Sequence, residues 1–305
     1  MRIHNSAKEV KMNFETNTAP TLASSALLVD LRISQATLRK LDKRASQEVV
    51  NTNNAKRGVA NVHKALLGDS NIFQAIGKHV GNARNLHVNM TTPWSDGGQR
   101  LIPTKRYFEY TKTMSDMQNE FFNLCEKFFI EYPNQVEQAK IKLGDLFNKG
   151  DYPTLDELKL KFAWNVYTFP CPDAGDIRVD LPAEALKQVR DDCEASYNGM
   201  ITKSMNDVWT RIHEALTKMS RTIDFGDDEK KSIFRDTLVS NVTGIVDMLD
   251  DFNLDNNPEK EKIRQQLEYT FQGVTPDALR EDAHFRAQTK KNVDDILKSL
   301  PSIGI

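Results

Sequence analysis

The sequence predicts a mainly α-helical protein: an elongated antiparallel helical bundle that carries a small two- or three-stranded antiparallel sheet. The main observation is a proline-free stretch of 41 residues, from Ala183 to Ile223, with a sustained apolar stripe at three- and four-residue steps. A helix of that length spans about 60 Å, at about 1.5 Å per residue. It cannot bury its stripe against itself, so we expect other long helices beside it. The stripe consists of Leu186, Val189, Cys193, Ser196, Met200, Ser204, Val208, Ile212, Ala215, Met219 and Ile223.

The composition supports an ordered protein with much exposed surface. The 305 residues are 39% hydrophobic and 28% charged, and the net charge is only −2, whereas disordered chains combine low hydrophobicity with high net charge. We expect residues 1–22 to form a flexible N-terminal tail and residues 23–305 to form a single helical domain, with a small β insertion around residues 161–181. No apolar run approaches the roughly 18 residues that a membrane span needs, and the polar first 21 residues do not resemble a secretory signal.

The first third of the chain opens on a strand. Residues Ala26–Ile33 alternate, with Val29, Leu31 and Ile33 on one face. Ser34 is a good helix N-cap, so a helix is predicted over residues 35–50. Further helices are predicted over residues 55–67 and 70–86. Residues 91–103 contain two prolines and paired glycines, which predicts a packed loop without regular structure.

The remaining elements are mostly helical. Residues 104–132 form a long helix, Pro133 interrupts it, and residues 134–148 form a shorter one. Two strands are predicted, one of aromatic and β-branched residues over Phe162–Phe169 and one of strict alternation over Ile177–Leu181. After the long proline-free helix, three more helices are predicted, over residues 228–252, 258–271 and 276–300.

No pattern in the sequence indicates a catalytic centre, a metal site or a cofactor site. Asp224-Phe225-Gly226 spells a kinase triplet but lacks the other kinase motifs. Asp251, Asn253 and Asp255 start like an EF-hand loop, but the twelfth position is a lysine instead of glutamate. The six histidines are scattered, and the three cysteines show no CxxC spacing. Cys125 and Cys193 are predicted to be buried thiols on apolar helix faces.

Two groups of polar residues in apolar settings are candidate partner-binding sites. One is the packed loop at residues 91–103. The other is the alternating strand at residues 176–180, where an arginine lies between two carboxylates. The simpler readings are a loop that only joins two helices and an ion pair that only holds the sheet. The candidate residues are Trp94, Asp96, Gln99, Arg100 and Arg178.

Charge is distributed unevenly along the chain. Residues 1–112 carry 17 Lys and Arg against 8 Asp and Glu, and residues 113–305 carry 24 against 35. This asymmetry favours internal complementarity, with an acidic partner such as nucleic acid as the alternative. Basic residues at i,i+4 spacing would place their charges on one side of the predicted helix and could form a nucleic-acid patch. A solvated helix face is the simpler interpretation, and no aromatic residues lie between the basic ones to stack on bases. The patch residues are Arg39, Lys40, Lys43, Arg44, Lys56 and Arg57.

Three segments together resemble one known family: residues 31–43, the loop at residues 92–103, and residues 176–180. It is an uncharacterised family of proteins of similar length from tailed bacteriophages, prophages and proteobacterial mobile elements. Its genes are often placed near those of a MoxR-type AAA+ ATPase and a von Willebrand factor A protein. The resemblance implies an adaptor or substrate role in an ATPase-driven assembly, and it carries no catalytic residues with it.

These observations lead to three hypotheses about function. The first is a non-enzymatic phage or mobile-element protein that works in the bacterial host cytoplasm through protein–protein contacts, with an AAA+ ATPase or with itself; a virion structural protein is a variant of it. The second is a nucleic-acid-binding protein that uses the basic N-terminal third. The third is an enzyme whose carboxylates converge between the loop and the sheet.

Overall fold

The computed structural model describes residues 22–68, 70–172, 182–224, 237–253 and 258–300. These residues are mainly α-helical, with one four-stranded and one two-stranded antiparallel sheet. The helices are α1 (Leu22–Ser25), α2 (Lys43–Thr52), α3 (Asn71–Met90), α4 (Thr104–Leu143), α5 (Leu155–Lys159), α6 (Ala183–Thr222), α7 (Thr237–Asp251), α8 (Pro258–Phe271), α9 (Pro276–Glu281) and α10 (Ala283–Ser299). The strands are β1 (Ala26–Ser34), β2 (Arg39–Asp42), β3 (Val62–Ala65), β4 (Thr92–Pro93), β5 (Arg100–Pro103) and β6 (Ala163–Pro170).

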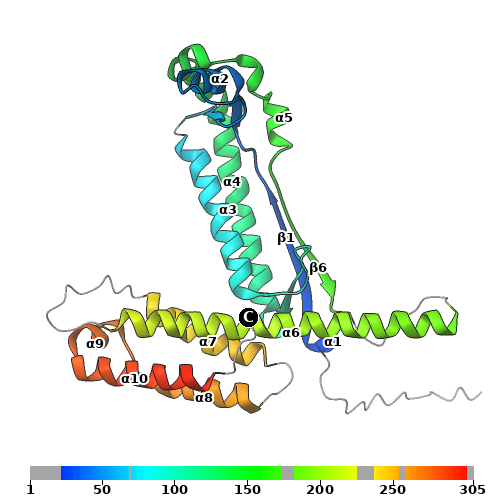
Figure 1. The fold of residues 1–305 in the computed structure, drawn as a ribbon, viewed down its shortest axis with the longest axis vertical. Helices are drawn as coiled ribbons and strands as arrows, with labels where there is room; N and C mark the ends of the chain where they lie inside the picture. The colour runs from blue at the N-terminus through cyan, green and yellow to red at the C-terminus, as the bar shows by residue number, and fades with distance from the viewer. Residues whose placement is uncertain (1–21, 69, 173–181, 225–236, 254–257, 301–305) are drawn as a thin grey trace, which may run out of the picture.

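The elements form an arm that stands on the middle of α6 (Figure 1). Helices α3 and α4 lie side by side in the arm, with β1 and β6 running along them. Helix α2 lies at the tip of the arm, and α7 to α10 lie along one half of α6. We call these two parts the arm and the base.

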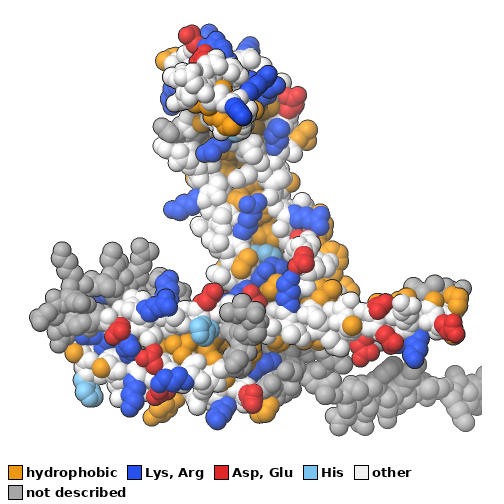
Figure 2. Space-filling view, viewed as in Figure 1, with side chains coloured by type: hydrophobic (Ala, Val, Ile, Leu, Met, Phe, Trp, Pro, Cys, Tyr) orange, Lys and Arg blue, Asp and Glu red, His pale blue; other side chains and the backbone are white. Residues whose placement is uncertain are grey.

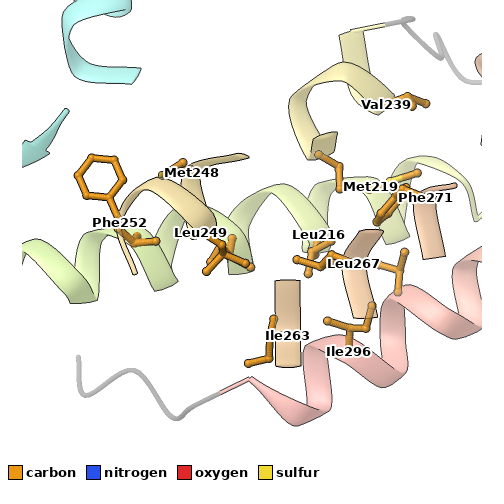
Figure 3. Packing of buried hydrophobic residues seen from close by; sticks show 14 of the residues in the cluster. Leu216, Met219, Val239, Met248, Leu249, Phe252, Ile263, Leu267, Phe271 and Ile296 are labelled. Atoms are coloured by element: carbon orange, nitrogen blue, oxygen red, sulfur yellow. The ribbon is translucent and has the colours of Figure 1, made fainter. Parts of the chain in front are cut away.

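The buried hydrophobic residues form two clusters, one in each part. The arm cluster is rich in aromatic residues and includes Tyr110, Phe121, Phe128 and Trp164. The base cluster gathers residues from α6, α7, α8 and α10 between those helices (Figure 3). The residues labelled in Figure 3 are Leu216, Met219, Val239, Met248, Leu249, Phe252, Ile263, Leu267, Phe271 and Ile296.

The four-stranded sheet contributes side chains to both clusters. Its order is β4-β5-β1-β6, and β1 pairs with β6 from Leu27↔Pro170 to Ser34↔Ala163. Side chains of neighbouring strand residues point to opposite faces. Leu28 therefore joins the base cluster, while Val29 joins the arm cluster. The predicted strand over 26–33 is confirmed, and the predicted strand over Ile177–Leu181 lies outside the described residues. The prediction of two or three strands is too low, because the described residues form this four-stranded sheet and a separate two-stranded sheet, β2 with β3.

Helix α4 is continuous over 40 residues, so the interruption predicted at Pro133 is wrong. Proline removes one backbone hydrogen bond, but Pro133 itself is exposed. The buried residues Phe129, Tyr132 and Ala139 on both sides of it hold the helix in register. The helix ends at Gly144, which adopts a φ of 50°.

The segment after β1 differs most from the prediction, because residues 35–50 and 55–67 do not form the two expected helices. The buried residue Leu38 has a left-handed φ of 44°, which turns the chain into β2. Helix α2 starts only at Lys43, where the Asp42 carboxylate accepts a hydrogen bond from Ala45 N at 3.0 Å. The second segment forms a turn followed by β3, which pairs with β2.

The C-terminal helices follow the prediction with one break. Helix α8 has the predicted bounds, and α7 (Thr237–Asp251) covers the described part of residues 228–252 except Phe252. The helix predicted over residues 276–300 divides at Asp282, whose carboxylate accepts from Phe285 N at 2.9 Å and starts α10. Cys125 is buried as predicted, but Cys193 is exposed, so that prediction is wrong.

Candidate functional site

The predicted packed loop at residues 91–103 is a β-hairpin, and it lies where the arm meets α6. Thr92 and Pro93 pair with Leu101 and Arg100. The turn is closed by Gln99 O, which accepts from Trp94 N at 3.1 Å and from Ser95 N at 3.2 Å. The expectation of no regular structure is therefore wrong, because the prolines occupy strand ends where their missing donors are tolerated.

Two of the four candidate residues in this hairpin, Trp94 and Asp96, contact the chain's own helix α6. Trp94 is only 3% exposed and packs edge-on against Tyr197, with ring centroids 5.7 Å apart. Asp96 is exposed at the turn, and its carboxylate lies 2.5 Å from Lys203 Nζ, which lowers the pKa of Asp96. Gln99 is half-buried and uses its backbone carbonyl in the turn.

Two arginines cap the C-terminal end of α3 at this junction. Arg100 donates from Nε to Thr91 Oγ1 at 2.6 Å and from Nη2 to Thr91 O at 3.0 Å. Arg211 of α6 donates to Val88 O at 2.9 Å and to Thr91 O at 3.0 Å. The last carbonyls of a helix have no partners within it and carry partial negative charge, so both cations stabilise this end.

A third charged group, Asp207, completes the junction. Its Oδ2 lies 2.7 Å from Arg211 Nη2, one turn along α6. Burial raises the pKa of Asp207, and the two arginines oppose that shift. Burial and the charge of Arg211 together lower the pKa of Arg100. The charge of Asp207 therefore offsets part of the repulsion between the two arginines.

Hydroxyl groups add a further link between the hairpin and α6. Thr92 Oγ1 and Ser204 Oγ are both buried and lie 2.5 Å apart. Ser204, Asp207 and Arg211 recur at three- and four-residue steps, so one face of α6 carries all three contacts. The arm is thus held on α6 by polar contacts in addition to Trp94.

A buried pair in the arm lies next to this junction. His87 Nδ1 is 2.8 Å from the Tyr110 hydroxyl, and both side chains are buried. Burial and, to a lesser extent, the charge of Arg100 lower the pKa of His87 to about 4, against an opposing effect of Asp30. Burial also raises the pKa of Tyr110. Both groups are therefore neutral at physiological pH.

The basic candidate residues come together at the tip of the arm, although not on one helical side. Arg39 and Lys40 lie on β2, Lys43 and Arg44 open α2, and the turn after α2 carries Lys56 and Arg57. All six are exposed. Figure 2 shows Lys and Arg side chains gathered over this tip. The proposed i,i+4 pairs on a single helix are wrong, since β2 and α2 divide them.

A buried lysine that the sequence analysis did not identify as a candidate holds together the elements at the tip of the arm. Lys64 Nζ lies 2.8 Å from Asp151 Oδ2 and 3.3 Å from Asp42 Oδ2, and it donates to Leu146 O at 2.7 Å. The Asp151 contact is the main reason that the pKa of Lys64 is raised. These contacts tie β3 to α2 and to the turns after α4.

Other candidate residues are accounted for or lie outside the described ranges. Arg178 lies outside the residues that the structure describes, as do Phe225, Gly226 and Asp255. Asp251 forms an ion pair with Arg106 at the foot of α4. Within the described ranges there is no group of three or more His, Cys, Asp or Glu side chains that could hold a metal ion. None of the described helices combines the length and apolar character that crossing a bilayer requires.

Comparison of the chain with protein-family models, with curated proteins and with solved structures finds no match. Asp207 and Arg211 form an i,i+4 pair, but no short-range pattern marks the other partners of Arg211 or those of Lys64, because these come from distant segments. Arg211, for example, contacts residues more than 100 positions earlier in the chain.

Proposed function

We propose that this chain is a non-enzymatic protein that acts through protein–protein contacts, and that the first part of α6 is its contact surface. This surface, which we call the projecting segment, comprises Ala183–Ser196. The observation that carries the proposal is that none of these 14 residues is buried among the described residues, although they belong to a 40-residue helix. At about 1.5 Å per residue the segment extends about 20 Å.

The position of the projecting segment supports this role. Contacts between α6 and the base cluster begin at Tyr197, which packs on Trp94. Beyond that point α6 continues past the foot of the arm, away from the half that α7 to α10 cover (Figure 1). An isolated helix of this length is marginal in water, so a partner would stabilise it.

The chemistry of the projecting segment fits a helical partner. Leu186, Val189 and Cys193 recur at three- and four-residue steps and form a short apolar stripe. Arg190 and Glu194 flank that stripe on the same side of the helix. In an antiparallel pair of two copies, Arg190 of each copy would face Glu194 of the other. Charge complementarity therefore favours a second copy of this chain as the partner.

The wider setting of the proposal comes from the family resemblance. We propose that the protein belongs to a phage or mobile element, acts in the bacterial host cytoplasm and self-associates. The antiparallel bundle that the sequence predicts is represented by two separate helix groups, α3 with α4 in the arm and α6 with α7, α8 and α10 in the base. An AAA+ ATPase is the second partner to test, and presence in the virion is a third outcome.

The experiment measures the mass of the full chain by light scattering after size-exclusion chromatography. We expect the wild type to be a dimer and the double variant Leu186→Asp/Val189→Asp to be a monomer, because the two charges interrupt the apolar stripe. The matched control is Gln188→Asp/Ala195→Asp, which adds the same charge to the opposite face of the same segment and leaves the dimer intact. A monomeric wild type, with no partner recovered by affinity purification from infected cells, would refute the proposal.

Cys193 provides an independent measurement, because its thiol is exposed within the stripe. In the antiparallel arrangement the two copies of Cys193 lie near the symmetry axis. Mild oxidation is expected to join two copies by a disulfide, and Cys193→Ser to prevent it. The buried thiols of Cys125 and Cys171, whose pKa values burial raises to about 12 and about 11, are not expected to react.

A further inference from the structure

The tip of the arm carries a large surplus of positive charge. Residues 35–68 contain seven Lys and Arg and only two acidic residues, Asp42 and Glu48. Both acids are already engaged: Asp42 contacts the buried Lys64, and Glu48 lies 3.5 Å from Arg44. The exposed cations therefore remain largely uncompensated. We call them the basic tip: Arg39, Lys40, Lys43, Arg44, Lys56 and Arg57.

Four of these six cations make no ion pair among the residues that the structure describes. The exceptions are Arg44, paired with Glu48, and Lys40, whose Nζ lies 3.7 Å from Asp151 Oδ1. Lys40 also lies directly opposite Lys64 in the β2–β3 ladder. Like charges in that position are unfavourable, and Asp151 between them offsets the repulsion. The chain thus concentrates positive charge here at a cost in stability.

The first turn of α2 shows the same cost. Lys43 and Arg44 occupy it, the turn contains no acidic residue, and the last turn contains no basic residue. The N-terminal end of a helix carries partial positive charge, so cations there are unfavourable. The Asp42 carboxylate at the N-cap offsets part of this cost.

A hollow along one side of α2 would admit an anion. Its volume is about 190 Å³, and its lining includes Lys43 from the helix, Arg57 from the following turn and Asn61. No carboxylate is among its lining residues. Gly58 beside it adopts a φ of 90°, which folds the turn back toward α2. Two cations from different elements thus converge on one concave site.

The composition of the tip distinguishes between classes of anionic partner. Protein–protein interfaces are depleted in lysine, whereas nucleic-acid interfaces are strongly positive and polar. Residues 35–68 contain no Phe, Tyr or Trp on which an unpaired base could stack. Both features favour the phosphate backbone of a duplex over single-stranded bases or an acidic protein.

We propose that the basic tip binds the phosphate backbone of double-stranded nucleic acid without sequence preference. Lys43 and Arg57 hold one phosphate in the hollow, and Arg39, Lys40, Arg44 and Lys56 meet neighbouring phosphates. The arm places this site at the far end from α6, so the duplex and the projecting segment do not compete for space (Figure 1).

The test measures binding of a labelled duplex DNA to the full chain by fluorescence anisotropy. If all six cations neutralise phosphates, the affinity falls about 1,000-fold between about 50 and 200 mM salt. Two duplexes of unrelated sequence are expected to bind equally. The variant Arg39→Glu/Lys43→Glu/Arg57→Glu is expected to lose binding at every salt concentration.

The matched control is Lys78→Glu/Lys112→Glu/Lys127→Glu, which makes the same change in net charge at exposed positions on α3 and α4. It is expected to keep most of the affinity. Circular dichroism checks that each variant is folded, and Lys56→Glu/Arg57→Glu, confined to an exposed turn, provides a second variant that leaves both strands and α2 unchanged. Three outcomes would overturn the proposal: no binding at low salt, equal loss in the control, or binding of polyglutamate in place of the duplex.

Discussion

Arg211 illustrates how a single side chain holds the arm on α6. Replacing it with Met removes two hydrogen bonds to the carbonyls that end α3 and leaves Asp207 without its closest cation. We expect Arg211→Met to lower the free energy of unfolding by about 2–3 kcal/mol, since hydrogen bonds from charged donors are worth about 1.5–3 kcal/mol. Urea denaturation measures this change.

Two controls separate this effect from a general loss of charge. Arg211→Met/Asp207→Asn removes the unpaired carboxylate as well, so part of the lost stability should return. Lys203→Met breaks the exposed pair with Asp96 on the same helix and should leave the urea midpoint unchanged. Equal destabilisation by Arg211→Met and Lys203→Met would contradict the idea that Arg211 stabilises the protein through its hydrogen bonds to the end of α3.

His87 should make stability depend on pH. Its pKa is about 4 in the folded chain and 6.5 as the reference value, so the unfolded chain binds more protons between these limits. The contribution of neutral His87 to the free energy of unfolding is therefore fully present above about pH 6.5. It decreases as the pH falls toward 4, by on the order of 3 kcal/mol. His87→Gln should remove most of this decrease in urea titrations at a series of pH values. An unchanged pH slope in that variant would contradict the assignment.

At the scale of elements, Pro133 lowers the stability of α4, and its replacement should raise it. Its ring is exposed, and its missing donor leaves one bond of the helix unmade. Pro133→Ala should therefore raise the free energy of unfolding by about 2 kcal/mol, somewhat less than the roughly 3 kcal/mol of a proline in a helix interior. Thermal unfolding measures the gain. Glu137→Ala, one turn further on an exposed position, should change stability little.

The elements that the sequence predicted correctly are those with long, uninterrupted periodicity. Helices α6 and α8 and strand β1 are examples, because many apolar residues along each one repeat the same signal. Residues 35–50 misled the prediction because their apolar spacing also suits a helix, while the left-handed Leu38 that breaks it leaves no mark in composition.

The candidate sites were predictable only in part. The hairpin had a recognisable signal, Asp96-Gly97-Gly98 between short apolar runs, which is a common turn sequence that we read as a loop. The sequence identifies the six basic residues as a candidate patch, but it does not predict that they lie on β2, on α2 and in the turn after α2. The contacts of Arg211 and Lys64 depend on the tertiary arrangement of distant segments, and no local pattern encodes them.

At the scale of the whole molecule, the shared sheet should make the arm and base unfold together. Leu28 and Val29 are adjacent in sequence yet belong to different clusters, so neither cluster can lose β1 without disturbing the other. Trp94 in the base cluster and Trp164 in the arm cluster serve as separate probes. Variants that keep only one of them, with the other tryptophans replaced by Phe, should show the same urea midpoint.

Different midpoints for the two probes would contradict this expectation and the predicted single domain over residues 23–305. Leu28→Ala and Val29→Ala provide the matched pair for the same question. Each removes buried side-chain volume from one cluster, and each should shift the transition reported by both tryptophans.

The length of α4 has a mechanical consequence. Its 40 residues separate the hairpin junction from the tip by about 60 Å, at about 1.5 Å per residue. If the arm tilts on α6, the pivot is the joint at Arg100 and Arg211, and the tip moves farthest. Over that length, a tilt of about 5° at the pivot displaces the far end by about 5 Å.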